Sequence, residues 1–124
     1  MGPDSTFSNP QVASVGLTEA QAKDRGHNVK VGTFSFAENS RAVAMGETEG
    51  GIKVVSDSDS GEIFGVHIIG PEAAELIDGM SLAIRLEATV QDVGNMIYLH
   101  PTLSEVLKEA SLDVDNRAIH KMKK

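Results

Sequence analysis

Two aliphatic segments joined by a short polar turn constrain the fold of this chain more than any other feature. Residues 52–55 and 63–69 are rich in Ile and Val, as strands are, and the turn between them reads Asp57-Ser58-Asp59-Ser60-Gly61. Asp, Ser and Gly are the residues that close tight turns between antiparallel strands. The pattern therefore predicts a β-hairpin in the middle of the chain.

The second strand of this hairpin is apolar on both of its faces. Strict alternation places Phe64, Val66 and Ile68 on one face and Ile63 and Ile69 on the other. A strand with two apolar faces has to be covered on both sides. We expect helices to cover one side and a partner subunit to help cover the other.

Local signals before the hairpin predict two strands and a helix. Thr18 and Gln21 have the spacing of a capping box, and Gly26 suits the left-handed position after the helix that they begin. Residues 29–36 read as a strand whose apolar residues change face, which suggests a bulge or a twist near Gly32. A shorter apolar run that precedes Thr18 is also strand-like: Val12 to Val15.

Helices are expected after the hairpin. Gly70-Pro71 begins one with an apolar residue at every third or fourth position, Thr89 caps a second, and Leu103 to Ala110 form a third. The predicted fold is α+β, with a mainly antiparallel sheet and helices packed on one face. Residues 7–112 form the expected domain, with a polar tail at 113–124 and, at 1–6, a short polar leader of the kind that expression of a cloned chain adds.

Composition excludes several classes of function. The net charge is −7, so the chain lacks the clustered Lys and Arg that neutralise phosphates in nucleic-acid binders. It has no cysteine, and hence no disulfide, thiolate metal site or thiol nucleophile of its own. No apolar run is long enough for a membrane span or a signal peptide. We therefore expect a cytoplasmic protein, or one of the mitochondrial matrix in a eukaryote.

The segment His100-Pro101-Thr102-Leu103-Ser104-Glu105 is the most informative for chemistry. Pro101 fixes its own φ and biases His100 toward an extended backbone, so the imidazole lies on a stiff turn before a helix. An imidazole titrates near neutral pH and suits general-base catalysis. Glu105 is close enough in sequence to bind one ring nitrogen, which fixes the tautomer and leaves the other nitrogen free to act.

A structural role explains the same residues. Thr102 to Glu105 is itself a capping-box pattern, so Glu105 can serve the helix backbone, and His100 can be an ordinary loop histidine. His67 lies in an apolar strand and is better explained as a satisfied core or interface histidine. The Asp57 turn lacks the Gly and Glu positions of a calcium loop, and no histidine pair has metal-ligand spacing. No dinucleotide-binding fingerprint or Walker loop occurs.

The chain from about Phe7 to Leu112 resembles the C-terminal dimerisation domain of the pyridine nucleotide-disulfide oxidoreductases. Within that family the pattern is most similar to the dihydrolipoamide dehydrogenases, although many of these carry a His at the place of Tyr98. Four blocks in the right order carry the resemblance: Asn9 to Thr18, Asn39 to Ala42, Gly65 to Pro71, and His100 to Glu105 followed by Lys108-Glu109-Ala110.

The resemblance implies a role for each part. In this family FAD, NAD and a redox-active cysteine pair belong to preceding domains of the chain, and this domain forms the homodimer interface. By resemblance, His100 is the general base that takes a proton from the dithiol at the partner subunit's flavin-disulfide site, and Glu105 orients it. The backbone of His100 and Pro101 would lie near the partner's FAD. A 2-oxoacid dehydrogenase-type complex is a further implied partner.

Three readings stay open. The resemblance favours part of an enzyme that converts dihydrolipoamide and NAD to lipoamide and NADH, with the 124-residue chain alone inactive and binding no cofactor. Another disulfide reductase of the family, such as a glutathione reductase, would keep His100 and Glu105 and change the substrate. A stand-alone dimerisation module would have no catalytic role.

Overall fold

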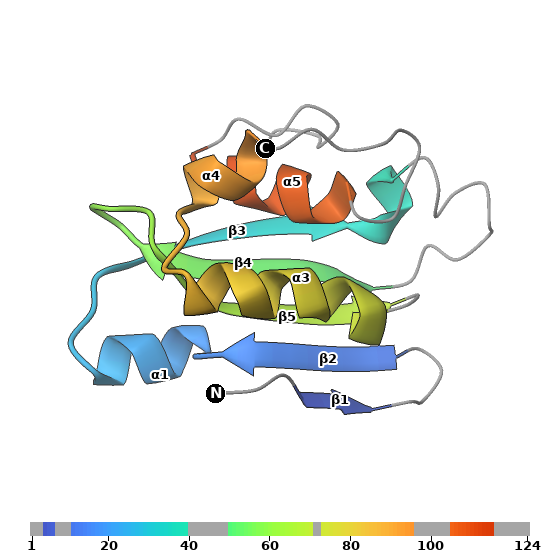
Figure 1. Ribbon diagram of the computed structural model, residues 1–124, viewed down its shortest axis with the longest axis horizontal. Coiled ribbons are helices and arrows are strands. Elements are labelled where there is room, and N and C mark those ends of the chain that lie inside the picture. The colour runs from blue at the N-terminus through green and yellow to red at the C-terminus, as the bar shows by residue number, and fades with distance from the viewer. Residues whose placement is uncertain (1–3, 7–10, 40–49, 71–72, 96–104, 116–124) are drawn as a thin grey trace.

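The computed structural model describes residues 4–6, 11–39, 50–70, 73–95 and 105–115 (Figure 1). Its elements follow one another along the chain in this order: β1 (Asp4–Thr6), β2 (Gln11–Gly16), α1 (Glu19–Asp24), β3 (Val29–Ser35), a 3-10 turn (Phe36–Glu38), β4 (Gly51–Asp57), β5 (Ile63–Gly70), α3 (Ala73–Arg85), α4 (Val90–Gly94) and α5 (Glu105–Asp113).

The strands of the described residues form one antiparallel sheet in the order β1-β2-β5-β4-β3. Helices α3 and α5 lie on one face of this sheet, and α4 packs beside α5 (Figure 1). The short helix α1 covers one end of the opposite face, where Ala22 packs with Leu17 and Val55. The predicted α+β fold, with an antiparallel sheet and helices on one face, is confirmed.

The predicted hairpin is present, with β4 and β5 paired in antiparallel register. One carboxylate oxygen of Asp57 closes the turn, since it accepts hydrogen bonds from the Asp59 N–H at 3.1 Å, the Ser60 N–H at 2.6 Å and the Ser60 hydroxyl at 2.9 Å. Gly61 has a positive φ of 79°, which a residue with a side chain rarely adopts. The turn residues thus explain the hairpin by themselves.

The bulge is in a different place from the one expected. Strands β3 and β4 pair without interruption from Val29 to Ser35, so there is no bulge at Gly32. The register shifts instead between Val55 and Ser56, where β4 faces β5. As a result, the prediction of which face of the sheet Ile63 and Phe64 lie on was wrong. Ile63 joins Val66 and Ile68 in the main core, and Phe64 packs against the smaller cluster under α1.

The apolar residues of β3 change face for another reason. Both faces of this strand are covered by other parts of the chain. Val31 packs toward the α1 cluster, whereas Phe34 lies in the main core. Gly32 faces α5 so closely that a Cβ there would lie 2.1 Å from the carbonyl oxygen of Ala110. The glycine is needed for helix–sheet contact and not for a bulge.

The predicted helix signals agree with the structure where it describes them. Thr18 and Gln21 form a reciprocal capping box, and Gly26 follows α1 with a φ of 84°. Thr89 caps α4 in the same way, with Asp92 as its partner. The buried face of α3 fills the centre of the core with four side chains: Ala73, Leu76, Ile77 and Met80. Pro71 lies outside the described residues.

Ordered structure extends past both ends of the expected domain 7–112. Asp4–Thr6, expected in the leader, pairs with β2 as the edge strand of the sheet. At the other end α5 continues through Asp113, the first residue of the expected tail, and Val114 is buried. Backbone pairing therefore includes Asp4–Thr6 in the fold, and the burial of Val114 includes residues 113–115.

Candidate functional site

The segment predicted to carry chemistry joins two packed helices. His100 and Pro101 lie outside the described residues, and Glu105 enters the described part through its backbone, as the first residue of α5. The helix predicted to follow His100 is present. The His100–Glu105 pair itself stays a prediction, but the elements that hold both ends of its segment are described.

Helix α5 is fixed tightly against the sheet. Ala110 is fully buried above Gly32, and the backbone N–H of Thr33 donates a 2.9 Å hydrogen bond to the Asp113 carboxylate. Gly94 of α4 also permits a close approach, since a Cβ there would lie 2.6 Å from a methyl carbon of Leu112. A side chain at Gly32 would push α5 away, because it would meet the backbone of that helix, whereas at Gly94 the Leu112 side chain would have to shift.

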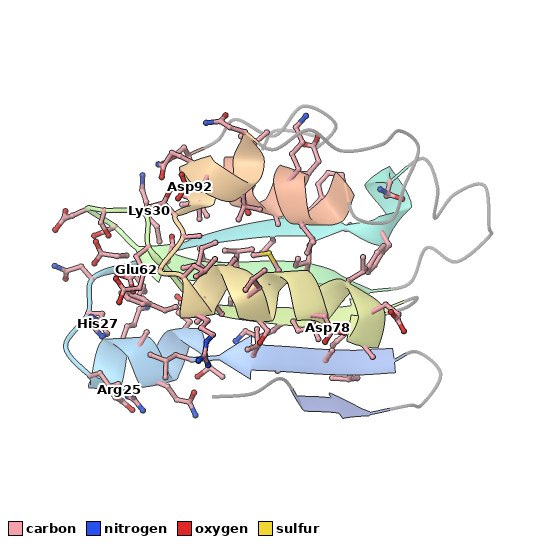
Figure 2. The ribbon with its side chains drawn as sticks, viewed as in Figure 1. Arg25, His27, Lys30, Glu62, Asp78 and Asp92 are labelled. Carbon is pink, nitrogen blue, oxygen red and sulfur yellow. The ribbon has the colours of Figure 1, made fainter. Side chains whose placement is uncertain are left out.

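Helix α4 is tied to the residues that follow α5. The Gln91 side-chain amide donates to the Asp115 carboxylate at 3.0 Å, and Lys30 of β3 lies 3.6 Å from the same carboxyl group. Figure 2 shows Asp92 on α4 and Lys30 on β3, near the end of the molecule that carries the hairpin turn. The two helices that flank residues 96–104 in the chain are therefore held together, and β3 joins the contact through Lys30.

A second candidate site is a groove of about 550 Å³ on the open face of the sheet, beyond the end covered by α1. Polar side chains alternate there with aliphatic ones that are unusually exposed for strand residues: Ile69 is 48% exposed and Val12 is 38% exposed. The groove is lined by residues of the four longer strands, among them Val12, Ser14, Thr33, Lys53, His67 and Ile69.

His67 is a satisfied histidine, as predicted, and it lies half-buried on this open face. Its Nε2 is 2.9 Å from the carbonyl oxygen of Leu17, which can only accept, so Nε2 carries the proton. In the neutral ring Nδ1 then accepts from the hydroxyl of Ser14 at 3.0 Å. Because both ring nitrogens are engaged, His67 holds β2 to β5 and is a poor candidate for a base.

Sequence reasoning missed an ion pair beside this groove. Lys53 lies 2.9 Å from one carboxylate oxygen of Glu19, and Lys23 lies 3.1 Å from the other. The hydrogen bond from Lys53, and then that from Lys23, lower the pKa of Glu19. The spacing of Glu19 and Lys23 on one helix was a visible signal. The longer-range partner, Lys53, required the fold.

The carboxylate of Asp57 is engaged within its own turn. It accepts hydrogen bonds from Asp59 and Ser60, and the backbone hydrogen bond from Ser60 is the largest cause that lowers the pKa of Asp57. Within the described residues no group of His, Asp and Glu side chains could hold a metal ion.

His27 is exposed on the connection after α1 (Figure 2). Its ring packs on Phe64, with the ring centroids 4.4 Å apart. His120 lies outside the described residues. No helix in the described part of the chain is both long and apolar enough to cross a membrane.

Two buried polar residues of the described part fall within the blocks that carry the family resemblance. Asn39 is 4% exposed and Glu109 is 2% exposed. Burying a carboxylate is costly unless it is paired or hydrogen-bonded. Sequence reasoning gave neither of them a role, since the pattern of α5 predicts only its apolar face.

Comparison with known proteins agrees with this picture. Residues 2–111 match the family described as pyridine nucleotide-disulphide oxidoreductase, dimerisation domain. Curated relatives named dihydrolipoyl dehydrogenase are 49% identical in Rhizobium etli, 47% in Zymomonas mobilis and 48% in Bacillus subtilis, each over 95% of this chain. The chain spans about a quarter of the length of these relatives.

Solved structures share the fold. The flavoprotein disulfide reductase RclA of Escherichia coli aligns with a TM-score of 0.84 and 27% identity, covering 89% of this chain and 25% of that one. LpdA of Mycobacterium tuberculosis aligns with a TM-score of 0.83 and 23% identity, covering 89% and 24%.

Proposed function

Because the chain belongs to the dimerisation-domain family of the pyridine nucleotide-disulphide oxidoreductases, we propose that it is the interface domain of an FAD- and NAD-dependent dihydrolipoyl dehydrogenase. One observation carries the proposal, the 47–49% identity to three bacterial dihydrolipoyl dehydrogenases over 95% of the chain. In this proposal the protein acts as a homodimer, and each copy contributes residues to the active site of the other.

The nucleotides are assigned to other domains of the protein. A dinucleotide site needs a parallel strand–helix–strand unit with a glycine-rich turn, whereas the described strands of this chain are all antiparallel. The sequence also lacks the glycine fingerprint. The described residues therefore do not fit FAD or NAD, and no step is assigned to them through either cofactor.

The proposed task of this chain is proton transfer. His100 takes the proton of a substrate thiol on a ring nitrogen, which leaves a thiolate able to attack a disulfide in the partner subunit. The resulting imidazolium stabilises the thiolate that is released. Glu105 accepts a hydrogen bond from the other ring nitrogen and so orients His100 and raises its pKa. The packed helices α4 and α5 support this role, since they flank this segment in the chain.

The test is turnover by the full-length protein that contains this chain. The parent should form NADH from dihydrolipoamide and NAD, whereas His100→Gln should lower kcat about 10²–10⁴-fold with flavin content unchanged. The matched control is His27→Gln. This variant alters an exposed histidine in the connection after α1 and should leave kcat as in the parent. Undiminished turnover by His100→Gln would exclude His100 as the base.

A pH profile tests the role of Glu105. Without the carboxylate the imidazolium is less stable, so Glu105→Gln should move the acidic limb of the rate profile toward lower pH and reduce the maximum. If Glu105 serves only to cap the helix, the variant will lose stability and the pH profile will keep its shape.

A second candidate is a disulfide reductase with another substrate. The fold likeness to RclA, at 27% identity, favours it over unrelated functions. Glutathione disulfide reduction measured beside NADH formation separates the two, because activity with glutathione alone would keep the dyad and change the substrate. A full-length protein without flavin and without either activity would instead be a dimerisation module. We expect the 124-residue chain alone to be inactive and colourless.

A further inference from the structure

Helix α4 is the last described element before His100, and it is short. It spans Val90–Gly94, and Asn95 caps its end. A helix of this length is not stable by itself, so its place is set by its contacts with the rest of the chain. His100 lies midway in the sequence between Asn95 and Glu105, the first residue of α5. The contacts that place α4 against α5 therefore set the distance between the two points from which the chain reaches His100.

The start of α4 is fixed by backbone hydrogen bonds to the hairpin. The Val90 N–H donates to the carbonyl of Gly61 at 2.8 Å, and the Ile63 N–H donates to the carbonyl of Ala88 at 3.0 Å. These bonds hold the N-terminal end of the helix beside the hairpin turn. They lie at the end of α4 that is farther from His100 in the sequence, so the direction of the helix depends on a second attachment.

Gln91 provides a second attachment through its side chain. Its amide nitrogen donates to the carboxylate of Asp115 at 3.0 Å, and both residues are half-buried. A carboxylate only accepts, so the nitrogen and not the oxygen of the amide has to face Asp115. The oxygen lies beside Gly61, where a Cβ would be 2.5 Å from it. The glycine therefore leaves room for the amide.

Asp115 connects α4 to two further elements. It directly follows α5, and its N–H donates to the carbonyl of Leu112 at 3.1 Å, so the carboxylate is carried by the end of that helix. Lys30 of β3 lies 3.6 Å from the same carboxyl group. Both side chains of this ion pair are partly exposed, so it contributes little to stability. The amide hydrogen bond is the more directional of the two contacts.

The apolar contacts of α4 do not explain this hydrogen bond. Val93 is buried, and Leu112 lies close against Gly94. Hydrophobic burial of this kind stabilises the helix pair but is non-directional, so it tolerates small shifts of one helix along the other. A hydrogen bond requires a narrow range of distance and angle. The contact of Gln91 with Asp115 therefore adds precision to a helix pair that is already stable.

We propose that Gln91 and Asp115 are positioning residues for the proposed reaction. Their hydrogen bond fixes α4 against α5, and so fixes the two points between which the chain carries His100. In this proposal neither residue acts on the reacting atoms directly. Proton transfer requires heavy atoms about 2.6–3.2 Å apart, and a misplacement of about 1 Å can lower the rate about 10²-fold. The inference rests on the proposed function, because it concerns the placement of its base.

Exchange of the donor and the acceptor in the full-length protein tests the pair. Gln91→Glu places two carboxylates face to face and should lower kcat for NADH formation about tenfold, with KM and flavin content within about twofold of the parent. Asp115→Asn keeps a carbonyl that accepts from the amide, so its kcat should stay within about threefold of the parent. The double variant restores the hydrogen bond with donor and acceptor exchanged, and its kcat should return to within about threefold of the parent.

Two controls separate positioning from a loss of folding. Gln21→Glu makes the same chemical change in the capping box of α1, where a carboxylate serves equally well, and should leave kcat unchanged. Thermal unfolding shows whether each variant is folded at the assay temperature. If Gln91→Glu is not, Gln91→Met takes its place, since it has a similar length and no amide. It should lower kcat at least about threefold without raising KM.

The outcomes separate this inference from the proposed function. A folded Gln91→Glu protein with the kcat of the parent would overturn the positioning role and leave the proposed function in place. A double variant as slow as Gln91→Glu would do the same, because the hydrogen bond would then not be the cause. If the parent reduces glutathione disulfide and forms no NADH, the proposed substrate is overturned, and the same fall and recovery of kcat with glutathione disulfide supports the pair. A parent that is inactive with both substrates would overturn both proposals.

Discussion

The two faces of the sheet are stabilised in different ways, although the same strands supply both. On β5, Ile68 is fully buried beneath the helices, whereas its neighbour Ile69 is 48% exposed on the opposite face. The helix-covered face is closed by aliphatic side chains and by Phe34 and Phe36. The open face is organised instead by hydrogen bonds of His67 and by the ion pair of Lys53 with Glu19.

This difference shows which part of the domain holds its shape and which part can receive another surface. Burial under α3 and α5 supplies the non-directional free energy that keeps the sheet and helices together. Polar contacts on the open face fix strand order at little cost and leave its aliphatic residues accessible. A contact surface can be added to or removed from such a face without loss of the fold.

The comparison is tested most strongly by shortening the two neighbours on β5. Ile68→Ala should lower the free energy of unfolding by about 2–5 kcal/mol, because it leaves a cavity under α3. Ile69→Ala removes the same atoms from a half-exposed site and should cost below about 1 kcal/mol. Urea unfolding of the chain measures both. Similar losses for the two variants would mean that the open face is packed as tightly as the core.

A smaller effect is expected on the open face itself. Ser14→Ala removes the hydroxyl that donates a hydrogen bond to Nδ1 of His67. The free energy of unfolding should fall by about 1 kcal/mol, because water can replace part of the lost hydrogen bond at this half-buried site. Ser14→Thr keeps a hydroxyl and suits a strand, so it should restore most of the loss. Thermal unfolding provides the measurement. A loss of unfolding free energy several times larger would mean that the hydrogen bond of His67 contributes as much to stability as a buried core side chain does.

Local chemistry explains why much of the fold was predictable. The Asp57 turn, the capping box of Thr18 with Gln21, and the buried stripe of α3 each depend on residues close in sequence. The bulge was misplaced because it depends on how β4 pairs with β5, which alternation in one strand cannot show. Gly32 gave the wrong signal, since its reason is the approach of Ala110 from a distant helix.

The supports of the candidate site were less predictable for the same reason. The hydrogen bond from Thr33 to Asp113 joins residues 80 positions apart, and the polar character of Asp113 gave no sign of it. Asp4–Thr6 enters the sheet through backbone bonds, which have no side-chain signature. His100 and Glu105 were found from local spacing together with resemblance.

The smallest effect concerns the ion pair at the rim of the open face. Lys53 and then Lys23 hold the pKa of Glu19 below its usual value of 4.5 in the folded chain. The stabilisation from a lowered carboxyl pKa is fully present above pH 4.5 and is lost as the pH falls through the folded pKa. Glu19→Gln should therefore be slightly less stable than the parent at pH 7, and the two should converge as the solution is acidified.

Salt separates this ion pair from a packing role of Glu19. All three side chains are partly exposed, so added salt should screen the attraction and reduce the difference between Glu19→Gln and the parent at neutral pH. Unfolding at a series of pH values, in low and high salt, measures both dependences. A difference that persists unchanged in acid and in high salt would show that the side chain of Glu19 acts by packing. The open face would then resemble the helix-covered face more closely than the distances of its polar groups indicate.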